Sequence, residues 1–279
     1  MRKRCRQVAY PAVWRELISG YLEKGALEYY RKDLFMDKKT IGIIGGMGPL
    51  ATVELFRLIV SETKSESDQE HIHILIDNNP QIPDRTNAIL NNGTSPVPQI
   101  VASAKRLESM GADFLIMPCN TSHYFADEIA REINIKLLNM VEATVKSLAA
   151  DGVKKFGLLA TTGTVKGGVY SRFSEPLGLE MLLPNEEEQE EVMRFIYSGV
   201  KAGNVNYDVS DFVRIVDRLL DEGAETLILG CTELPLGKRM YGLDFPSLDT
   251  LKILAEASII EAGYSLNYGE ENEQIGIPS

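Results

Sequence analysis

Apolar runs that suit buried strands alternate with amphipathic stretches that suit helices along most of this chain. The run TIGIIGG at 40–46 is followed by a helical pattern with Pro49 near its first turn, and IHILIDN at 72–78 is a second strand-like run. The alternation continues, and KKFGLLATTGT at 154–164 begins the series again. Strands that alternate with helices predict an α/β fold with mostly parallel sheets flanked by helices. Ligand sites in such folds form beyond the C-terminal ends of the strands.

The chain also partly repeats itself. GIIGGMG at 42–48 resembles GLLATTG at 157–163, and GADFLIMPCNT at 111–121 resembles GAETLILGCTE at 223–233. The two similar offsets predict two pseudo-symmetric lobes with a cleft between them. We place lobe 1 at 37–149, with a helix at about 247–264 packing back on it, and lobe 2 at 150–246.

The two ends of the chain differ from this pattern. Apolar residues at helical spacing (Val13, Leu17, Tyr21, Leu22) predict an N-terminal helical extension over residues 1–36. The α/β pattern begins only after it, so Met36 is an alternative start. Residues 265–279 are polar and acidic, and we expect a disordered C-terminal tail there.

Composition excludes several classes of function. The net charge of −11 argues against binding to nucleic acid or to an anionic membrane, although a locally basic pocket can still bind an acidic molecule. No apolar stretch approaches the roughly 20 residues that span a bilayer, and no signal peptide is recognisable. Three cysteines do not make a disulfide framework, so we expect a cytoplasmic protein.

Two of these cysteines occupy equivalent places in the repeat. Cys119 and Cys231 each end an apolar strand and precede a helix, whose N–H groups and dipole we expect to lower the pKa of the thiol. A single buried cysteine is more often a small apolar core residue. A pair facing one cleft suits chemistry: a thiolate on one face removes a proton from carbon, and a thiol on the other returns one. Such a transfer inverts a stereocentre, and N–H donors must stabilise the charge that develops.

The motifs IGIIGGMGPLATVELF, NNPQIPDRT, GADFLIMPCNTSH, GLLATTGTV, GVKAGN and GCTELP together resemble the aspartate racemases of the aspartate/glutamate racemase superfamily. The resemblance covers about residues 37–255. It implies a cofactor-independent racemase with the substrate between two lobes and with Cys119 and Cys231 as the catalytic pair. Because both cysteines are present, it favours reversible interconversion of L- and D-aspartate, with glutamate as a further substrate.

The resemblance also implies which residues bind the substrate. Arg85 in PDRT and Lys201 in GVKAG would bind the distal carboxylate, a role that a guanidinium fork and an ammonium suit. Five further residues complete the expected substrate contacts: Met47, Asn120, Thr121, Thr161 and Thr232. His123 and Glu233 are candidates for a supporting role beside the two thiols. We expect a homodimer.

Other functions remain open at this point. No cluster of side chains has metal-ligand spacing, and no lysine stands in a recognisable pyridoxal phosphate context, so we expect neither a metal nor a cofactor. The glycine spacing at 42–48 does not match a dinucleotide fingerprint. The alternatives are a dicarboxylate isomerase or decarboxylase of the same superfamily, or a non-catalytic protein that binds dicarboxylates.

Overall fold

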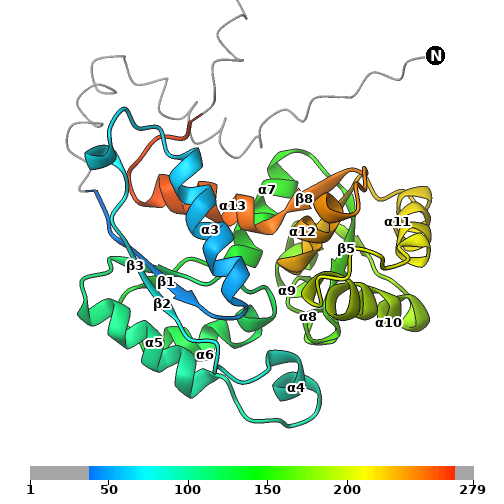
Figure 1. Ribbon diagram of the computed structural model, residues 1–279, viewed down its shortest axis with the longest axis horizontal. Helices are drawn as coiled ribbons and strands as arrows, with labels where there is room; N and C mark the ends of the chain where they lie inside the picture. Colours follow the sequence, from blue (N-terminus) through cyan, green and yellow to red (C-terminus); the bar gives the residue numbers. More distant parts are fainter. Residues whose placement is uncertain (1–37, 268–279) are drawn as a thin grey trace, which may run out of the picture.

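The computed structural model describes residues 38–267. The expected extension at 1–36 and most of the expected tail lie outside these residues. Within them the chain forms two four-stranded sheets, each with helices packed against it (Figure 1). All pairings between the named strands are parallel, which confirms the predicted α/β fold.

The first sheet has the strand order β2-β1-β3-β4. Its strands are β1 (Ile41–Gly45), β2 (Ile74–Asn78), β3 (Phe114–Ile116) and β4 (Lys136–Leu137). All five residues of β1 are buried, which explains its continuous apolar and glycine sequence. Beyond β1 the chain turns at Gly46, which has φ of 96° and lies against the backbone of Asn79, so a side chain would be both strained and blocked.

The second sheet repeats this plan with the order β6-β5-β7-β8. Its strands are β5 (Lys155–Ala160), β6 (Glu180–Leu182), β7 (Thr226–Gly230) and β8 (Ser247–Asp249). The repeated sequence segments fall on equivalent strands, because β1 matches β5 and β3 matches β7 in position. The predicted pseudo-symmetry of two lobes is therefore confirmed.

Helices pack on both sheets. Those that follow the first four strands are α3 (Pro49–Glu62), η1 (Asp68–Glu70), α4 (Arg85–Leu90), α5 (Val97–Ser109), η2 (Thr121–Phe125), α6 (Ala126–Ala130) and α7 (Met140–Ala150). Those that follow β5 are α8 (Thr162–Lys166), α9 (Ser171–Ser174), η3 (Glu175–Leu177), α10 (Glu186–Arg194), the π-helix η4 (Phe195–Lys201), α11 (Ser210–Asp221), α12 (Glu233–Met240) and α13 (Thr250–Glu261). In the first lobe α3 and α13 lie on one side of the sheet and α5 on the other (Figure 1).

The last helix returns to the first lobe. Leu251, Leu254 and Ile259 of α13 share a core cluster with β1 and α3 residues, and α13 also contacts α7 and β7. One detail of the expected helix at about 247–264 is wrong: its first three residues form strand β8 of the second sheet, and Asp249 then caps α13.

The chain beyond α13 is ordered for longer than its composition indicates. Leu266, inside the expected tail at 265–279, is buried and forms an antiparallel bridge with Thr63 at the end of α3. Residues 268–279 lie outside the described part of the chain. The lobe boundaries themselves stay a prediction.

Candidate active site

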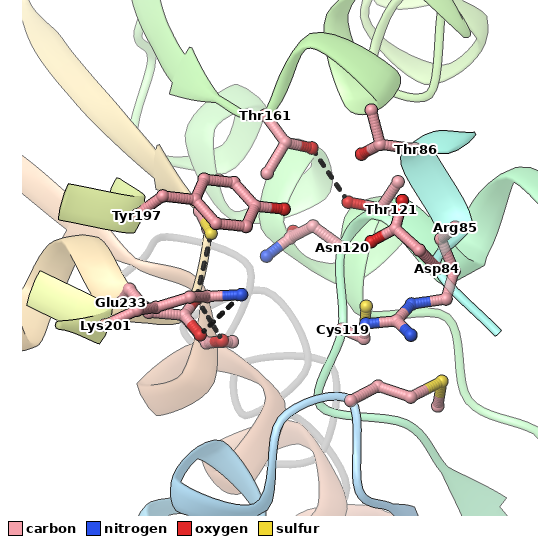
Figure 2. Close-up of a pocket in the computed structure, with 14 residues that line it drawn as sticks. Asp84, Arg85, Thr86, Cys119, Asn120, Thr121, Thr161, Tyr197, Lys201 and Glu233 are labelled. Carbon is pink, nitrogen blue, oxygen red and sulfur yellow. Dashed lines mark hydrogen bonds and ion pairs between the residues drawn. The ribbon is translucent and has the colours of Figure 1, made fainter. Parts of the chain in front are cut away.

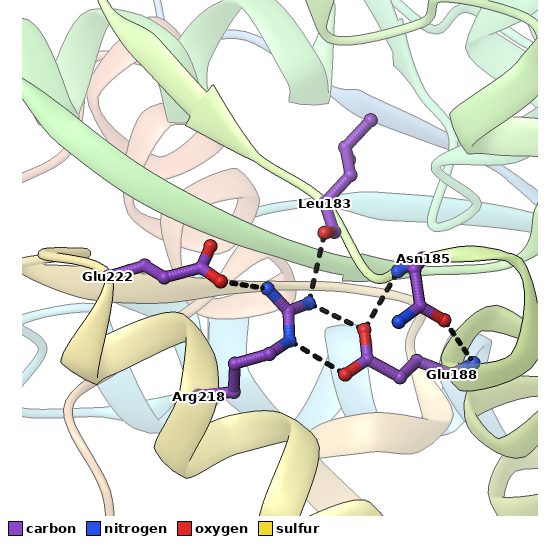
Figure 3. Close-up of polar contacts among 5 residues, drawn as sticks. All are labelled: Leu183, Asn185, Glu188, Arg218 and Glu222. Atoms are coloured by element: carbon purple, nitrogen blue, oxygen red, sulfur yellow. Dashed lines mark hydrogen bonds and ion pairs between the residues drawn. The ribbon is translucent and has the colours of Figure 1, made fainter.

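A pocket lies between the two lobes, at the C-terminal ends of β1, β3, β5 and β7. Side chains from both lobes surround it (Figure 2). Its lining consists of Met47, Asp84, Arg85, Thr86, Cys119, Asn120, Thr121, Thr161, Tyr197, Lys201, Gly230, Cys231, Thr232 and Glu233. Ten of the eleven candidate residues from the sequence are in this lining, and His123 is not. Their roles toward a substrate stay predictions.

Cys231 belongs to a chain of polar contacts in the second lobe. It follows β7, and its Sγ donates a hydrogen bond of 2.9 Å to Glu233 Oε2. Glu233 Oε1 in turn lies 3.4 Å from Lys201 Nζ. The expected lowering of the thiol pKa is wrong for Cys231, because burial raises its pKa and the Glu233 carboxylate raises it further. These neighbours therefore favour the thiol form of Cys231.

Lys201 reaches the pocket from the end of the π-helix η4. Tyr197, four residues earlier, places its ring so that Lys201 Nζ lies 4.6 Å from the ring centroid. Burial acts to lower the pKa of Lys201, but the neighbouring Glu233 carboxylate acts in the opposite direction and the pKa is raised. The ammonium thus stays charged between an aromatic face and a carboxylate.

Cys119 lies on the first-lobe side of the pocket. It follows β3, is 6% exposed, and its backbone carbonyl accepts a hydrogen bond of 2.9 Å from His123 Nδ1. The other ring nitrogen, Nε2, accepts the N–H of Met140 at 3.2 Å. Burial lowers the pKa of His123 to about 4, so the ring is neutral. Both ring nitrogens of His123 bind backbone groups, so the ring fixes the loop after Cys119, and a supporting role beside the thiol stays a prediction.

Arg85 is the cation of the first lobe. It begins α4, and its Nη1 donates to the carbonyls of Ile82 and Pro83 at 3.1 and 3.0 Å. Within residues 38–267 it makes no ion pair, and its buried Nε has no hydrogen-bond partner. Arg85 and Cys119 both come from the first lobe and line the same pocket as Lys201 and Glu233 (Figure 2). A buried donor without a partner suits an anionic ligand.

Three threonine hydroxyls join the lobes beside the pocket. Thr121 Oγ1 lies 3.0 Å from Thr161 Oγ1 and 2.9 Å from Thr164 Oγ1, and the latter two are 3.1 Å apart. All three residues are buried, so their rotating hydroxyls satisfy one another. Thr121 and Thr161 bond to each other, so a ligand that binds either hydroxyl must share these bonds.

Asn120 also ties the lobes together. Its Oδ1 accepts a hydrogen bond of 2.6 Å from Tyr170, and its Nδ2 donates to Thr250 Oγ1 at 3.1 Å. The residue is 2% exposed. The side chain predicted to bind substrate is therefore first a structural link that fixes the loop after Cys119.

Four lining residues were not predicted: Asp84, Thr86, Tyr197 and Gly230. Asp84 and Thr86 flank Arg85 in the PDRT motif, so the motif already contained them. Tyr197 had a weaker signal, its spacing of four residues from Lys201 in a helical segment.

The part of the chain that the structure describes contains no group of three His, Cys, Asp or Glu side chains that could hold a metal ion. Nor does any helix within residues 38–267 have the length and apolar character needed to cross a membrane.

The chain is similar in sequence and fold to known amino-acid racemases. Picrophilus torridus aspartate racemase matches 82% of this chain and 96% of its own at 33% identity, with a TM-score of 0.71. The broad specificity amino-acid racemase RacX of Bacillus subtilis (strain 168) is 23% identical over 223 residues, which cover 78% of this chain and 96% of that protein. A glutamate racemase of Aquifex pyrophilus is 28% identical over 178 residues, 60% of each chain.

The family described as Asp/Glu/Hydantoin racemase matches residues 44–258, which include every residue of the pocket and all strands except the first part of β1. This chain therefore belongs to the Asp/Glu/Hydantoin racemase family.

Proposed function

We propose that the protein interconverts L- and D-aspartate by proton transfer between Cys119 and Cys231. The observation that carries this proposal is the position of both thiols at one pocket, each on a different lobe, with the cations Arg85 and Lys201 in the same lining. The similarity to an aspartate racemase supports the choice of substrate. Glutamate is the second candidate substrate, because a glutamate racemase is also among the relatives.

In this mechanism the amino acid lies between the lobes with its α-carbon between the sulfur atoms. One thiolate removes the α-proton, and the opposite thiol donates its own proton to the other face. Neither sulfur forms a bond to carbon. Arg85 and Lys201 bind the distal carboxylate, and hydroxyl and N–H groups around Thr121, Thr161 and Thr232 bind the α-carboxylate as charge develops on it.

We also propose that the reaction needs neither pyridoxal phosphate nor a metal, because two thiols supply both proton transfers. A pyridoxal absorbance of the active purified protein, or loss of activity with a chelator, would contradict this. The homodimer and the cytoplasmic location are further proposals. Light scattering of the purified protein and fractionation of cells test them.

The decisive experiment incubates each enantiomer of aspartate in D₂O and follows chirality and deuterium together. We expect inversion with one solvent deuterium at the α-carbon. Cys119→Ala and Cys231→Ala should each abolish inversion, and Cys5→Ala, which changes the third cysteine, should leave it intact. Near wild-type inversion by both single variants would refute the two-thiol mechanism. Release of CO₂, or isomerisation of a dicarboxylate, would favour the alternatives of the superfamily.

A further inference from the structure

Glu233 contacts a cation and a thiol at the same time. Its Oε1 lies 3.4 Å from Lys201 Nζ, and its Oε2 accepts the hydrogen bond of 2.9 Å from Cys231 Sγ. The side chain of Glu233 is only 17% exposed, so water screens these contacts weakly. One carboxylate therefore links the residue that we expect to bind the substrate side chain with the thiol that we expect to move the α-proton (Figure 2).

We propose that an acidic substrate activates Cys231 by taking Lys201 away from Glu233. The distal carboxylate of the substrate pairs with Lys201, and Glu233, without its cation, becomes a stronger acceptor for the Cys231 proton. That proton moves from Sγ to Oε2 and leaves a thiolate and a neutral carboxyl group, with no other bond changed. This inference rests on the proposed function and adds a specificity-determining role for Glu233 to it.

The surroundings of Cys231 explain why such a step is needed. Burial and the charge of Glu233 raise the pKa of Cys231, so the resting thiol is a poor base. While Lys201 neutralises Glu233, that carboxylate is a weak acceptor. An ammonium has three donors on a flexible stem, so Lys201 can change partners without breaking a rigid bidentate geometry.

Tyr197 holds the ammonium of Lys201 near the pocket while Lys201 changes its carboxylate partner. Its ring lies 4.6 Å from Lys201 Nζ, and both residues are on η4, so the ring face attracts the ammonium whichever carboxylate it pairs with. The Lys201 side chain is 37% exposed, which leaves it room to turn toward a ligand. We assign Tyr197 as a positioning residue for Lys201.

The proposal makes a specific statement about substrate choice. A neutral amino acid leaves Lys201 paired with Glu233, so Cys231 is not activated even when that amino acid is bound. Acidic substrates are then selected in kcat as well as in KM. A pocket that only binds the distal carboxylate would select mainly in KM.

The first test is Glu233→Gln, which keeps the shape of the side chain and removes its charge. We expect kcat for aspartate to fall at least tenfold, because the acceptor for the Cys231 proton is lost. We expect KM for aspartate to fall severalfold, because Lys201 no longer has a competing carboxylate. An unchanged kcat overturns the proposal, and so does a lower kcat with an unchanged or raised KM.

The second test supplies the substrate in two pieces. L-Alanine has the α-carbon and α-carboxylate of aspartate, and acetate supplies a separate carboxylate for Lys201. In D₂O, we expect acetate to accelerate α-proton exchange of alanine severalfold in the wild-type protein. In Lys201→Met, exchange without acetate should exceed the wild-type rate, because Glu233 is always free, and acetate should add nothing. Inhibition or no effect by acetate in the wild type overturns the proposal.

A matched pair elsewhere in the chain provides the control. Lys146 and Glu142 form an ion pair of 2.7 Å on the surface of α7, away from the pocket lining. Glu142→Gln and Lys146→Met make the same charge changes and should leave kcat, KM and exchange unchanged. Circular dichroism checks that all variants are folded.

Two kinds of failure can be distinguished. If the wild-type protein neither inverts nor exchanges aspartate or glutamate, the proposed function has failed. If the wild-type protein is active but Glu233→Gln and Lys201→Met behave like it, only this inference has failed.

Discussion

At the residue scale, the two thiols occupy equivalent places but have different neighbours. Cys231 donates to Glu233, whereas within residues 38–267 no hydrogen bond to Cys119 Sγ is present, although Arg85 lines the same pocket. The sequence already predicted Glu233 beside Cys231 from their spacing. It could not predict the direction of the Cys231 pKa shift, since this depends on burial by residues far away in the chain.

The unpaired guanidinium of Arg85 leads to a prediction about substrate affinity. Arg85→Leu should raise KM for aspartate more than a hundredfold, because a buried carboxylate without its partner costs about 3–5 kcal/mol. Lys201→Met should raise KM less, since water replaces an ammonium more easily. Steady-state kinetics with both acidic amino acids measures these changes.

Arg214→Leu is the control for this prediction, because Arg214 is exposed on α11 and pairs with Asp211. It should leave KM unchanged. If the wild-type protein prefers neutral amino acids to both acidic ones, the roles of Arg85 and Lys201 are refuted.

At the scale of elements, the segment after Cys119 shows why the local sequence pattern could not predict the type of helix. The sequence predicts a helix directly after Cys119, but the structure has the 3₁₀ segment η2 followed by the short helix α6. In an α-helix the carbonyl of Cys119 would accept the N–H of His123. Here the carbonyl of Cys119 instead accepts a hydrogen bond from the His123 ring. The backbone N–H of His123 donates to the carbonyl of Asn120 at 3.0 Å. A buried side chain thus decides the helix type, which periodicity does not report.

Helix α13 carries a carboxyl group that should make stability depend on pH. Burial raises the pKa of Glu256 from 4.5 to about 7, although Lys252 acts against this. Between these values the folded protein binds more protons than the unfolded chain, so the free energy of unfolding falls as pH rises from about 4.5 to 7. Glu256→Gln should remove this loss and gain up to about 3 kcal/mol at pH 8, with little change at pH 4. Urea unfolding across this pH range measures the difference.

Glu261 on the same helix is the matched control with the opposite sign. Burial would raise its pKa, but ion pairs with Lys136 and Lys39 at 2.6 and 2.7 Å hold the pKa below its usual value. Its contribution is present above the usual pKa and is lost on acidification. Glu261→Gln should therefore destabilise the protein at neutral pH and have no effect in acid. Equal effects of the two variants at every pH would contradict both assignments.

At the scale of the whole molecule, the internal repeat predicted the two lobes and their equivalent strands. The last helix of each half begins with the same kind of N-cap. Asn139 caps α7 and Asp249 caps α13, and each side chain accepts hydrogen bonds from two backbone N–H groups. What the repeat could not show is how the halves are joined. The contacts of Thr121 and Asn120 across the lobes join residues at least 40 positions apart, where no sequence period links them.

Because α13 returns to the first lobe, we expect the two lobes to unfold together, so that a substitution in one lobe destabilises both. Leu254 is fully buried in the first-lobe core, although it follows the whole second lobe in sequence, and α13 also contacts β7. Leu254→Ala should cost about 2–5 kcal/mol. Because α13 bridges both sheets, we expect hydrogen exchange to accelerate in peptides from β1 and from β5 together.

Leu219→Ala, the same change at a fully buried position of α11 in the second lobe, should affect both peptides in the same way. Faster exchange confined to the mutated lobe would show instead that the lobes unfold independently, and that the pocket between them depends on docking of two separately stable halves.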